Sequence, residues 1–278
     1  MRESAKVVEQ AREYYDSGDA DQFYFHVWGG EDIHIGLYEN TEDDIFEASR
    51  RTVQRMTEQL PHRLPGSKVL DIGAGYGGSA RFLAKEKGMP VTCLNLSTVQ
   101  NERNRSLNQA QNLSILVEVV DGSFEELPFA DGSYEVVWSQ DAILHSGDRL
   151  KVFQEVDRVL KAGGDFIFTD PMQAENVDAQ ILQPVLNRIH LASMGSIDTY
   201  RGYADQLGWE TVGVHDLTEH LPNHYARVKA VLEAREEELK TLCSEDYRAR
   251  MKQGLDHWIN AGRQGALAWG ILHFRKPA

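Results

Sequence analysis

Four glycines lie between a short apolar run and a helical pattern in the stretch LDIGAGYGGSARFL, residues 70 to 83. Gly73, Gly75 and Gly78 match the G-x-G-x-x-G spacing of loops that join a strand to a helix beside a nucleotide. Glycine lets the backbone approach a ligand closely, and the helix that follows presents free N–H groups and the positive end of its dipole. The stretch therefore predicts a strand–turn–helix unit that binds a nucleotide-like ligand.

A regular alternation of strands and helices follows this loop. Short apolar or β-branched runs predict strands at 68–73, 91–96, 115–120, 135–140 and 165–170. Helices are predicted over 77–87, after Ser97, and over 149–164, where a glycine cap ends the helix. Two further strands are expected at 211–217 and 266–274. Such alternation indicates an α/β fold with a parallel doubly wound sheet, whose ligand lies beyond the carboxyl ends of the strands.

The two ends of the chain are more helical. Residues 3 to about 60 are predicted to be helical, with Thr41 as the N-cap of the last helix, and helices are also expected at 176–192, 198–207 and within 220–262. We therefore expect a helical cap over residues 1–62 and a ligand-binding domain over 63–278 with a helical insert at about 172–210. The insert and the cap can form a lid over the switch point of the sheet.

The composition excludes several classes of partner. A net charge of −14, from 43 acidic and 29 basic residues, argues against a nucleic-acid partner. No apolar run approaches the roughly 18 residues of a membrane span, and the N-terminus lacks the apolar core of a secretory signal. Cys93 and Cys243 alone make neither a disulfide framework nor a metal site, so no metal is expected. These features predict a cytoplasmic protein, as a monomer or a homodimer.

The balance of basic residues allows two interpretations. The 29 basic residues comprise 19 Arg and 10 Lys. An acidic surface with scarce Lys is typical of salt-adapted proteins, because dense carboxylates keep a protein hydrated at high ionic strength. An ordinary acidic cytoplasmic enzyme is the alternative.

Two polar residues at strand ends distinguish between possible nucleotides. Asp71 lies two residues before Gly73, where a carboxylate repels a pyrophosphate but favours a cation. Asn95 ends the second strand, where a dinucleotide-binding domain has an acid on the ribose, although Asn can also bond a ribose hydroxyl. S-adenosylmethionine (SAM) carries a sulfonium and an ammonium but no phosphate, so it fits both positions. An NAD-binding oxidoreductase is the alternative from another class of enzyme.

The third strand runs into the turn DGSFEELPF, which starts at Asp121. Asp121 and Phe124 can offer an adenine an acceptor for its amine and an apolar face. With these residues, the chain from about Val69 to Met172 resembles the class I SAM-dependent methyltransferases. The motifs are LDIGAGYGGSARFLA, DGSFEELPFADGSYEVVWSQDAILH and EVDRVLKAGGDFIFTD.

This resemblance implies a Rossmann-like, doubly wound, seven-stranded and mostly parallel sheet whose last strand is antiparallel. It also implies that Gly73 and Gly75 line the methionine part of SAM, which leaves as S-adenosylhomocysteine, and that Asn95 replaces the usual ribose acid. The candidate cofactor-binding residues are Asp71, Gly73, Ala74, Gly75, Asn95, Leu96, Gln100, Asp121, Gly122, Ser123, Phe124 and Gln140. Gln100 has an alternative role in a capping box with Ser97, and for Gly77 and Gly78 we favour helix–strand packing.

Further stretches narrow the methyl acceptor to small amines. The segment WSQDAILHSGD (138–148) is similar to the matching part of methyltransferases that act on phosphoethanolamine and on glycine derivatives. The segments FYFHVWGGEDIHIGLYENTEDDI (23–45) and TYRGYADQLGWETVGVHDLTEHL (199–221) resemble sarcosine/dimethylglycine N-methyltransferases, which complete glycine betaine synthesis. The resemblance implies an SN2 transfer of a methyl group to a neutral amine. The alternatives are a phosphobase methyltransferase, a sterol or fatty-acyl methyltransferase, and a non-catalytic SAM-binding module.

His145 is the candidate base by its pKa class. Asp141 lies four residues earlier and shares a face with His145 if the loop continues into a helix. In phosphoethanolamine methyltransferases the matching Asp and His belong to a catalytic network with an N-terminal tyrosine, for which Tyr15 and Tyr24 are the candidates here. The alternative is that Asp141 and His145 only hold the loop beneath the lid.

The acceptor itself calls for two kinds of side chain. Aromatic faces stabilise a quaternary ammonium, and Trp28, Tyr38, Tyr200 and Tyr203 are the candidates, with Trp209 as a further option. An arginine binds a carboxylate in bidentate fashion, and Arg188 is the candidate, with Arg201 as the other option. Core packing and an exposed helix face are the alternative roles of these residues.

Overall fold

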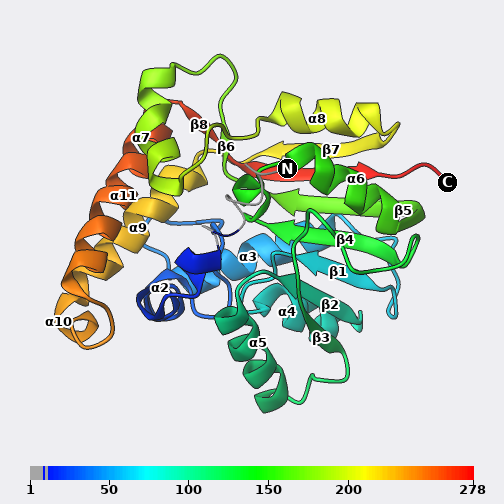
Figure 1. The fold of residues 1–278 in the computed structure, drawn as a ribbon, viewed down its shortest axis with the longest axis horizontal. Coiled ribbons are helices and arrows are strands. Elements are labelled where there is room, and N and C mark those ends of the chain that lie inside the picture. The colour runs from blue at the N-terminus through cyan, green and yellow to red at the C-terminus, as the bar shows by residue number, and fades with distance from the viewer. Residues whose placement is uncertain (1–8, 10–11) are drawn as a thin grey trace.

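A twisted seven-stranded sheet forms the centre of the protein in the computed structural model, which describes residue 9 and residues 12–278 (Figure 1). Its strands lie in the order β3-β2-β1-β4-β5-β9-β7. The bounds are β1 Val69–Ile72, β2 Val91–Asn95, β3 Val117–Asp121, β4 Tyr134–Gln140, β5 Leu160–Thr169, β7 Glu210–Asp216 and β9 Gly270–Arg275. Strands β1 to β5 pair in parallel, and β9 runs antiparallel to both β5 and β7. The predicted sheet with an antiparallel last strand is confirmed.

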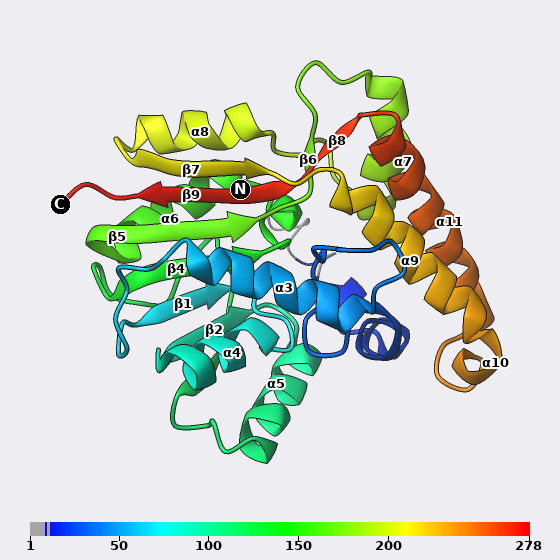
Figure 2. The same cartoon turned by 180° about the vertical axis from the view of Figure 1, so that it is seen from behind.

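Helices cover both faces of the sheet. Helices α6 (Arg149–Val159) and α8 (Ile197–Gln206) lie on one face, and α3 (Ile45–Glu58) and α4 (Gly78–Lys87) on the other, with α5 (Thr98–Ala110) beside β2 and β3 (Figures 1 and 2). Each face of the sheet has its own apolar core. Successive residues of β5 point into opposite cores, because side chains alternate along a strand. Phe166 and Phe168 pack with Phe153 of α6, whereas Ile167 packs with Val53 of α3.

A third group of helices lies beyond the carboxyl ends of the strands (Figure 1). It contains α2 (Gly18–Phe23), the π-helical turn η1 (Tyr24–Trp28), α7 (Ala179–Ile189), α9 (His220–Ala234), α10 (Glu236–Leu239) and α11 (Glu245–Arg263). These elements share one apolar cluster, to which Trp28, Tyr225 and Trp258 belong. The short strands β6 (Met172–Gln173) and β8 (Leu267–Ala268) pair antiparallel and connect this group to the sheet.

Several element boundaries differ from the sequence prediction. Helix α3 begins after Asp44, whose side chain accepts a hydrogen bond from the Glu47 amide, so Asp44 rather than Thr41 is the N-cap. The chain over residues 29–44 is not helical. Helix α6 ends at Val159 instead of at the glycines, because Leu160 already pairs with Tyr134 in the sheet.

Two other predicted segments are divided. The helical stretch 220–262 consists of α9, α10 and α11, and the strand 266–274 is split into β8 and β9 at Trp269. Trp269 leaves the ladder and donates a side-chain hydrogen bond to Asp141. A tertiary contact of this kind has no signature in local periodicity. The parts of the predicted N-terminal helix over residues 1–8 and 10–11 lie outside the described residues.

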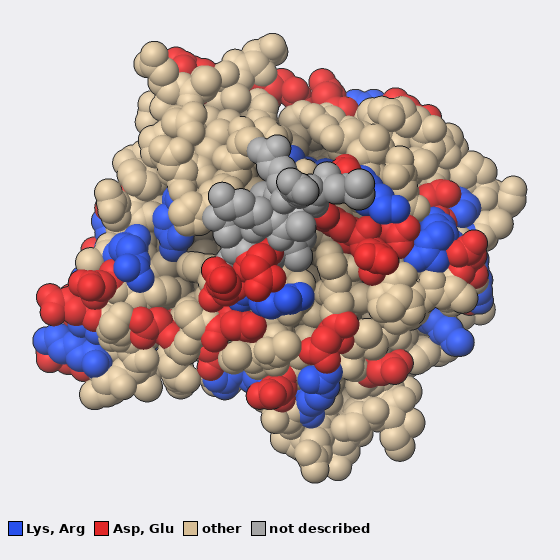
Figure 3. All heavy atoms as spheres, in the orientation of Figure 1, with Lys and Arg blue, Asp and Glu red and all other residues tan. Residues whose placement is uncertain are grey.

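The visible surface is rich in carboxylates. Figure 3 shows Asp and Glu spread over much of one face, with Lys and Arg between them.

Within the described ranges, no helix is both long and apolar enough to cross a bilayer. No group of three or more His, Cys, Asp or Glu side chains arranged to hold a metal ion is found among the described residues.

Candidate active site

The glycine loop after β1 adopts the left-handed backbone that its sequence requires. Gly73, Gly75 and Gly77 have φ angles of +78°, +52° and +75°. A Cβ atom on Gly73 would lie 2.4 Å from Cβ of Ala142, and one on Gly78 would lie 2.1 Å from Oδ1 of Asp32. Gly78 therefore allows the loop around residue 32 to pack on α4, so it is a packing residue whose partner is a loop and not the predicted strand.

A first cavity lies at the carboxyl ends of β1 to β4. It is lined by Tyr15, Ile33, Gly73, Gly75, Asn95, Leu96, Ser97, Gln100, Gly122, Ser123, Phe124, Gln140, Asp141, Ala142 and His145. Most of the predicted cofactor-binding residues meet here, and we refer to this space as the cofactor cavity. The rest of that predicted set, Asp71, Ala74 and Asp121, lies elsewhere.

Gln100 and Asn95 form a pair at the end of β2. The Gln100 amide donates to Oγ of Ser97 over 3.2 Å, so Ser97 caps α5, while Nδ2 of Asn95 donates to Oε1 of Gln100 over 3.0 Å. Gln100 therefore takes part in the helix cap and also lines the cofactor cavity. Asp121 accepts hydrogen bonds from Asn101 and Arg105, over 2.8 Å and 2.6 Å, and its side chain lies outside the cavity lining.

A small polar chamber adjoins the cofactor cavity at the end of β1. It is lined by Glu31, Asp32, Ile33, His34, Asp71, Gly73, Ala74, Gly75, Gly78, Ser79 and Gln140. Asp71 is only 3% exposed, and burial, together with the charge of Asp32, raises its pKa to about 8. Nε2 of Gln140 is buried without a hydrogen-bond partner among the described residues. This chamber can accept a ligand group with a positive charge and an acceptor atom.

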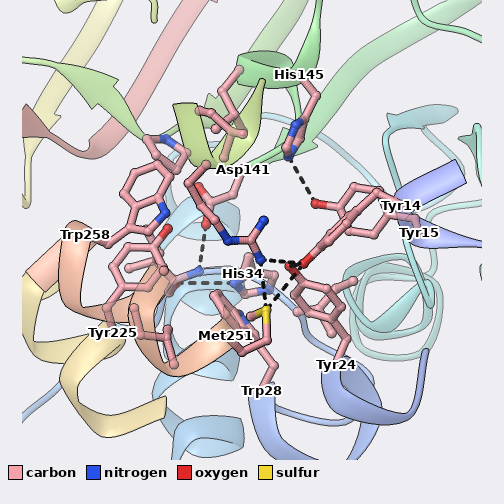
Figure 4. Close-up of a pocket in the computed structure, with 18 of the residues that line it drawn as sticks. Tyr14, Tyr15, Tyr24, Trp28, His34, Asp141, His145, Tyr225, Met251 and Trp258 are labelled. Carbon is pink, nitrogen blue, oxygen red and sulfur yellow. Dashed lines mark hydrogen bonds between the residues drawn. The ribbon is translucent and has the colours of Figure 1, made fainter. Parts of the chain in front are cut away.

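A second cavity lies between η1, α7, α9 and α11. Aromatic side chains surround much of it, as Figure 4 shows for Tyr14, Tyr24, Trp28, Tyr225 and Trp258. The rings of Tyr225 and Trp258 stack with centroids 4.9 Å apart. We call this space the aromatic cavity. Sequence reasoning identified Tyr24 and Trp28 but missed Tyr225 and Trp258, because nothing local marks α9 and α11 as its walls.

Four residues line both cavities and mark the seam between them: Tyr15, Ile33, Asp141 and His145. The Tyr15 hydroxyl lies 3.0 Å from Nε2 of His145 (Figure 4). The Tyr24 hydroxyl contacts the Tyr14 hydroxyl over 3.2 Å instead. Burial, with the charges of Arg149 and Arg188, lowers the pKa of His145 to about 4, and burial raises the pKa of Tyr15. The Tyr15–His145 pair is therefore neutral at physiological pH and shares one hydrogen.

Asp141 makes contacts other than the expected pair with His145. Its carboxylate accepts hydrogen bonds from the Ile35 amide over 2.6 Å and from Nε1 of Trp269 over 2.8 Å. Residues 143–145 form a short 3₁₀ turn that begins beyond Asp141, which has a φ of +51°. The four-residue spacing therefore does not place Asp141 and His145 on one helix face, and no hydrogen bond joins them among the described residues.

Arg188, in the last turn of α7, extends into the aromatic cavity. Its guanidinium donates to the Tyr14 hydroxyl over 3.3 Å and to Sδ of Met251 over 2.9 Å, and lies 5.4 Å from the centroid of the Tyr14 ring. No carboxylate of the described chain makes an ion pair with it. A partly buried cation without an anionic partner is costly, so the site favours an anionic ligand group.

Three aromatic residues predicted to bind the acceptor lie outside both cavities. The Tyr38 hydroxyl lies 2.9 Å from Nδ1 of His224, and the Tyr200 hydroxyl donates to Asp170 over 2.5 Å. Tyr203 packs edge-on against Phe153 beside the sheet. The two options, Trp209 and Arg201, also lie elsewhere: Trp209 is buried in the core, and Arg201 is exposed on α8.

Known proteins share this architecture. A family model described as a methyltransferase domain matches residues 70–168. The fold superposes on phosphoethanolamine N-methyltransferase 2 of Haemonchus contortus, which was solved with S-adenosyl-L-methionine. That match has a TM-score of 0.83 and 19% identity, and covers 96% of this chain and 60% of the other. The Rossmann-like sheet and the family model define a SAM-dependent methyltransferase.

Two closer relatives specify the family. The chain is 57% identical to the sarcosine/dimethylglycine N-methyltransferase of Aphanothece halophytica, over 100% of both chains. The crystal structure of a candidate sarcosine dimethylglycine methyltransferase from Galdieria sulphuraria has 48% identity and a TM-score of 0.90, covering 95% of this chain and 99% of the other. The chain belongs to the family of sarcosine/dimethylglycine N-methyltransferases.

S-adenosylmethionine is the cofactor of this enzyme, and the described residues fit it. The glycine turn allows close approach, the Asn95–Gln100 pair offers amide groups to a ribose, and Phe124 offers an apolar face. The chamber at Asp71 suits the cationic amino-acid end. The fit depends most on Asp71. It belongs to the glycine motif itself, and its carboxyl group lines the chamber.

We predict that Asp71→Asn weakens SAM binding about tenfold, because a buried carboxylate next to a cation is lost. In the wild type, affinity should rise from about pH 6 to about pH 8 as Asp71 ionises, and this rise should be absent in the variant. Calorimetric titration with SAM measures both effects. Asp131→Asn is the control, because Asp131 is exposed and pairs only with surface Arg158. Equal affinities and parallel pH profiles would contradict the assignment.

Proposed function

We propose that this enzyme methylates sarcosine and/or dimethylglycine and so forms glycine betaine. The observation that carries the proposal is Arg188, a cation to which no described residue offers a carboxylate. It lies in an aromatic cavity that meets the cofactor cavity at a shared seam. A small N-methylated amino acid has the two groups that such a cavity favours, a carboxylate and a methylated amine. The names of the close relatives support the same acceptors.

In this proposal Arg188 binds the acceptor carboxylate and the aromatic rings surround its methylated nitrogen. Arginine can hold a carboxylate through two parallel hydrogen bonds. Each aromatic face stabilises a quaternary ammonium by roughly 0.5–2 kcal/mol. Trp28, Tyr225 and Trp258 supply such faces, so the cavity stabilises the cation that forms as the nitrogen gains its last methyl group.

The acceptor nitrogen must lose its proton before it can react. An aliphatic amine is mostly protonated at neutral pH, with a pKa of about 10, and only the neutral form has a free lone pair. When bound, SAM supplies a methyl carbon on a sulfonium, and the amine lone pair forms the N–C bond as the S–C bond breaks and S-adenosylhomocysteine is left. Dry aromatic surroundings favour the neutral amine, because burial disfavours a charged group.

Tyr15 and His145 position the acceptor nitrogen at the seam. The His145 pKa of about 4 makes it a weak base, so we do not assign the pair to storing a proton. We assign it to accepting an N–H hydrogen bond from the acceptor as it enters the seam, which orients the nitrogen before its lone pair is freed. Asp141 supports the seam indirectly, through its hydrogen bonds to other segments. Its carboxylate binds Ile35 and Trp269, which places the seam residue Ile33 and the loop that carries His145.

We expect Tyr15→Phe and His145→Ala each to lower kcat by about tenfold to a hundredfold, the usual range for a positioned polar group. The SAM dissociation constant should stay within about twofold in both variants. Because the pKa of His145 is near 4, kcat/KM of the wild type should keep rising from about pH 6 to about pH 9 with deprotonation of the amine. Near-normal kcat in both variants would contradict a role at the seam. Tyr203→Phe is the control, because Tyr203 lies outside both cavities and packs against Phe153 beside the sheet.

A methyl-transfer assay with glycine, sarcosine, dimethylglycine and phosphoethanolamine, with products identified by mass, tests the function itself. We expect methylation of sarcosine, dimethylglycine or both, with betaine as the final product. Preference for phosphoethanolamine would overturn the proposal in favour of a phosphobase methyltransferase.

Arg188→Ala should raise KM for dimethylglycine about a hundredfold. The KM of Arg188→Lys should lie between those of the wild type and Arg188→Ala, because lysine cannot bind a carboxylate in bidentate fashion. Arg201→Ala is a matched control, since Arg201 is exposed on α8. Dimethylethanolamine, which lacks the carboxylate, should be a poor acceptor whose KM does not respond to Arg188→Ala. An unchanged KM for dimethylglycine in Arg188→Ala would remove the carboxylate-binding role.

We also propose the wider organisation that the sequence predicts. Residues 1–62 would form the cap and residues 63–278 the SAM-binding domain with a helical insert at about 172–210. Contacts of Tyr14, Tyr15 and Arg188 with the cavities support a joint lid. A cytoplasmic location and a monomeric or homodimeric state belong to the same proposal, and light scattering of the purified protein tests the latter.

A further inference from the structure

We propose that Gly254 is a positioning residue that determines carboxylate recognition, because it lets the Arg188 side chain lie flat against α11. The inference rests on the proposed role of Arg188 as the acceptor-binding cation. Gly254 has no functional group, so it touches neither reaction partner through its own chemistry.

The geometry at the crossing of α7 and α11 carries this inference. A Cβ atom on Gly254 would lie 2.6 Å from Nε of Arg188 and 3.1 Å from its Cδ. Separations below 3.0 Å do not occur between such atoms, so any larger residue would force the guanidinium away. The collision falls on the arginine side chain and not on backbone, so the side chain would move and the helix would stay.

Gly254 stands in the interior of a long helix, where glycine is unfavourable. Helix α11 spans 19 residues, from Glu245 to Arg263, and Gly254 is near its middle. Glycine destabilises a helix interior relative to alanine because it loses more backbone entropy on folding. Its backbone there has no left-handed φ, so no conformational need explains the glycine. The close approach of Arg188 supplies a reason.

The same face of α11 also holds the guanidinium. Met251 lies one turn before Gly254, and its Sδ accepts from Arg188 over 2.9 Å. The same nitrogen, Nη2, also donates to the Tyr14 hydroxyl over 3.3 Å. Gly254, Met251 and Tyr14 all line the aromatic cavity, so the arginine lies between α11 and the N-terminal segment. A methyl group at position 254 would push the cation out of these contacts.

The test is Gly254→Ala, measured for stability, SAM binding and kinetics. We expect an unchanged or higher melting temperature, a SAM dissociation constant within about twofold, and a KM for dimethylglycine raised about tenfold with a smaller change in kcat. Gly202→Ala is the matched control, because Gly202 is inside α8 and a Cβ atom there meets nothing within 4 Å. It should leave KM unchanged.

A double-mutant cycle separates positioning from a general packing effect. In the Arg188→Ala background, Gly254→Ala should not raise KM further, because the side chain that it displaces is gone. If Gly254→Ala folds poorly, Arg188→Ala/Gly254→Ala should restore stability. A failure of the double variant to do so, or an unchanged KM in Gly254→Ala while Arg188→Ala raises it, would overturn the inference and leave the proposed function intact. An unchanged KM in Arg188→Ala itself would instead contradict the proposed function.

Discussion

The carboxylate of Asp141 is the contact on which both cavities depend. It stands just after β4, partly buried and in a left-handed backbone conformation, and it accepts hydrogen bonds from the Ile35 amide and the Trp269 indole. These donors come from opposite ends of the chain. One carboxylate therefore joins the N-terminal segment and the β8–β9 link to the carboxyl end of the central strand. Burial makes these bonds strong and makes the loss of either donor expensive.

The charges of the site separate its two ligands. Asp71 is buried at the end of β1 and favours a cation in the chamber, whereas Arg188 favours an anion in the aromatic cavity. The neutral Tyr15–His145 pair lies between them. A cationic methyl donor and a carboxylate-bearing acceptor would each be attracted to one side of the seam. The same arrangement brings the electrophile and the amine together at a seam whose carboxylate, Asp141, is held by two hydrogen bonds.

Sequence reasoning identified most of the residues that line the cofactor cavity, because they follow strand ends. Gly73, Asn95, Gly122 and Gln140 come at or just after the ends of four strands, and the carboxyl ends of parallel strands meet at one edge of a sheet. It identified the lining of the aromatic cavity only in part. Arg188 and Trp28 line the aromatic cavity, whereas Tyr38 and Tyr200 are in other contacts, and Tyr225 and Trp258 had no motif to mark them.

The sequence by itself determined the alternation of strands and helices, the parallel sheet and its ligand-binding edge, because periodicity, glycine spacing and strand-end residues are local features. The antiparallel last strand followed only from the resemblance to a known family. Only the tertiary structure decided which partner Asp141 has, since a short 3₁₀ turn breaks the helical spacing to His145. It also decided that α7, α9 and α11 enclose the aromatic cavity and that Gly254 makes room for Arg188. Packing between helices far apart in the chain depends on shape and volume, which leave no pattern in a single segment.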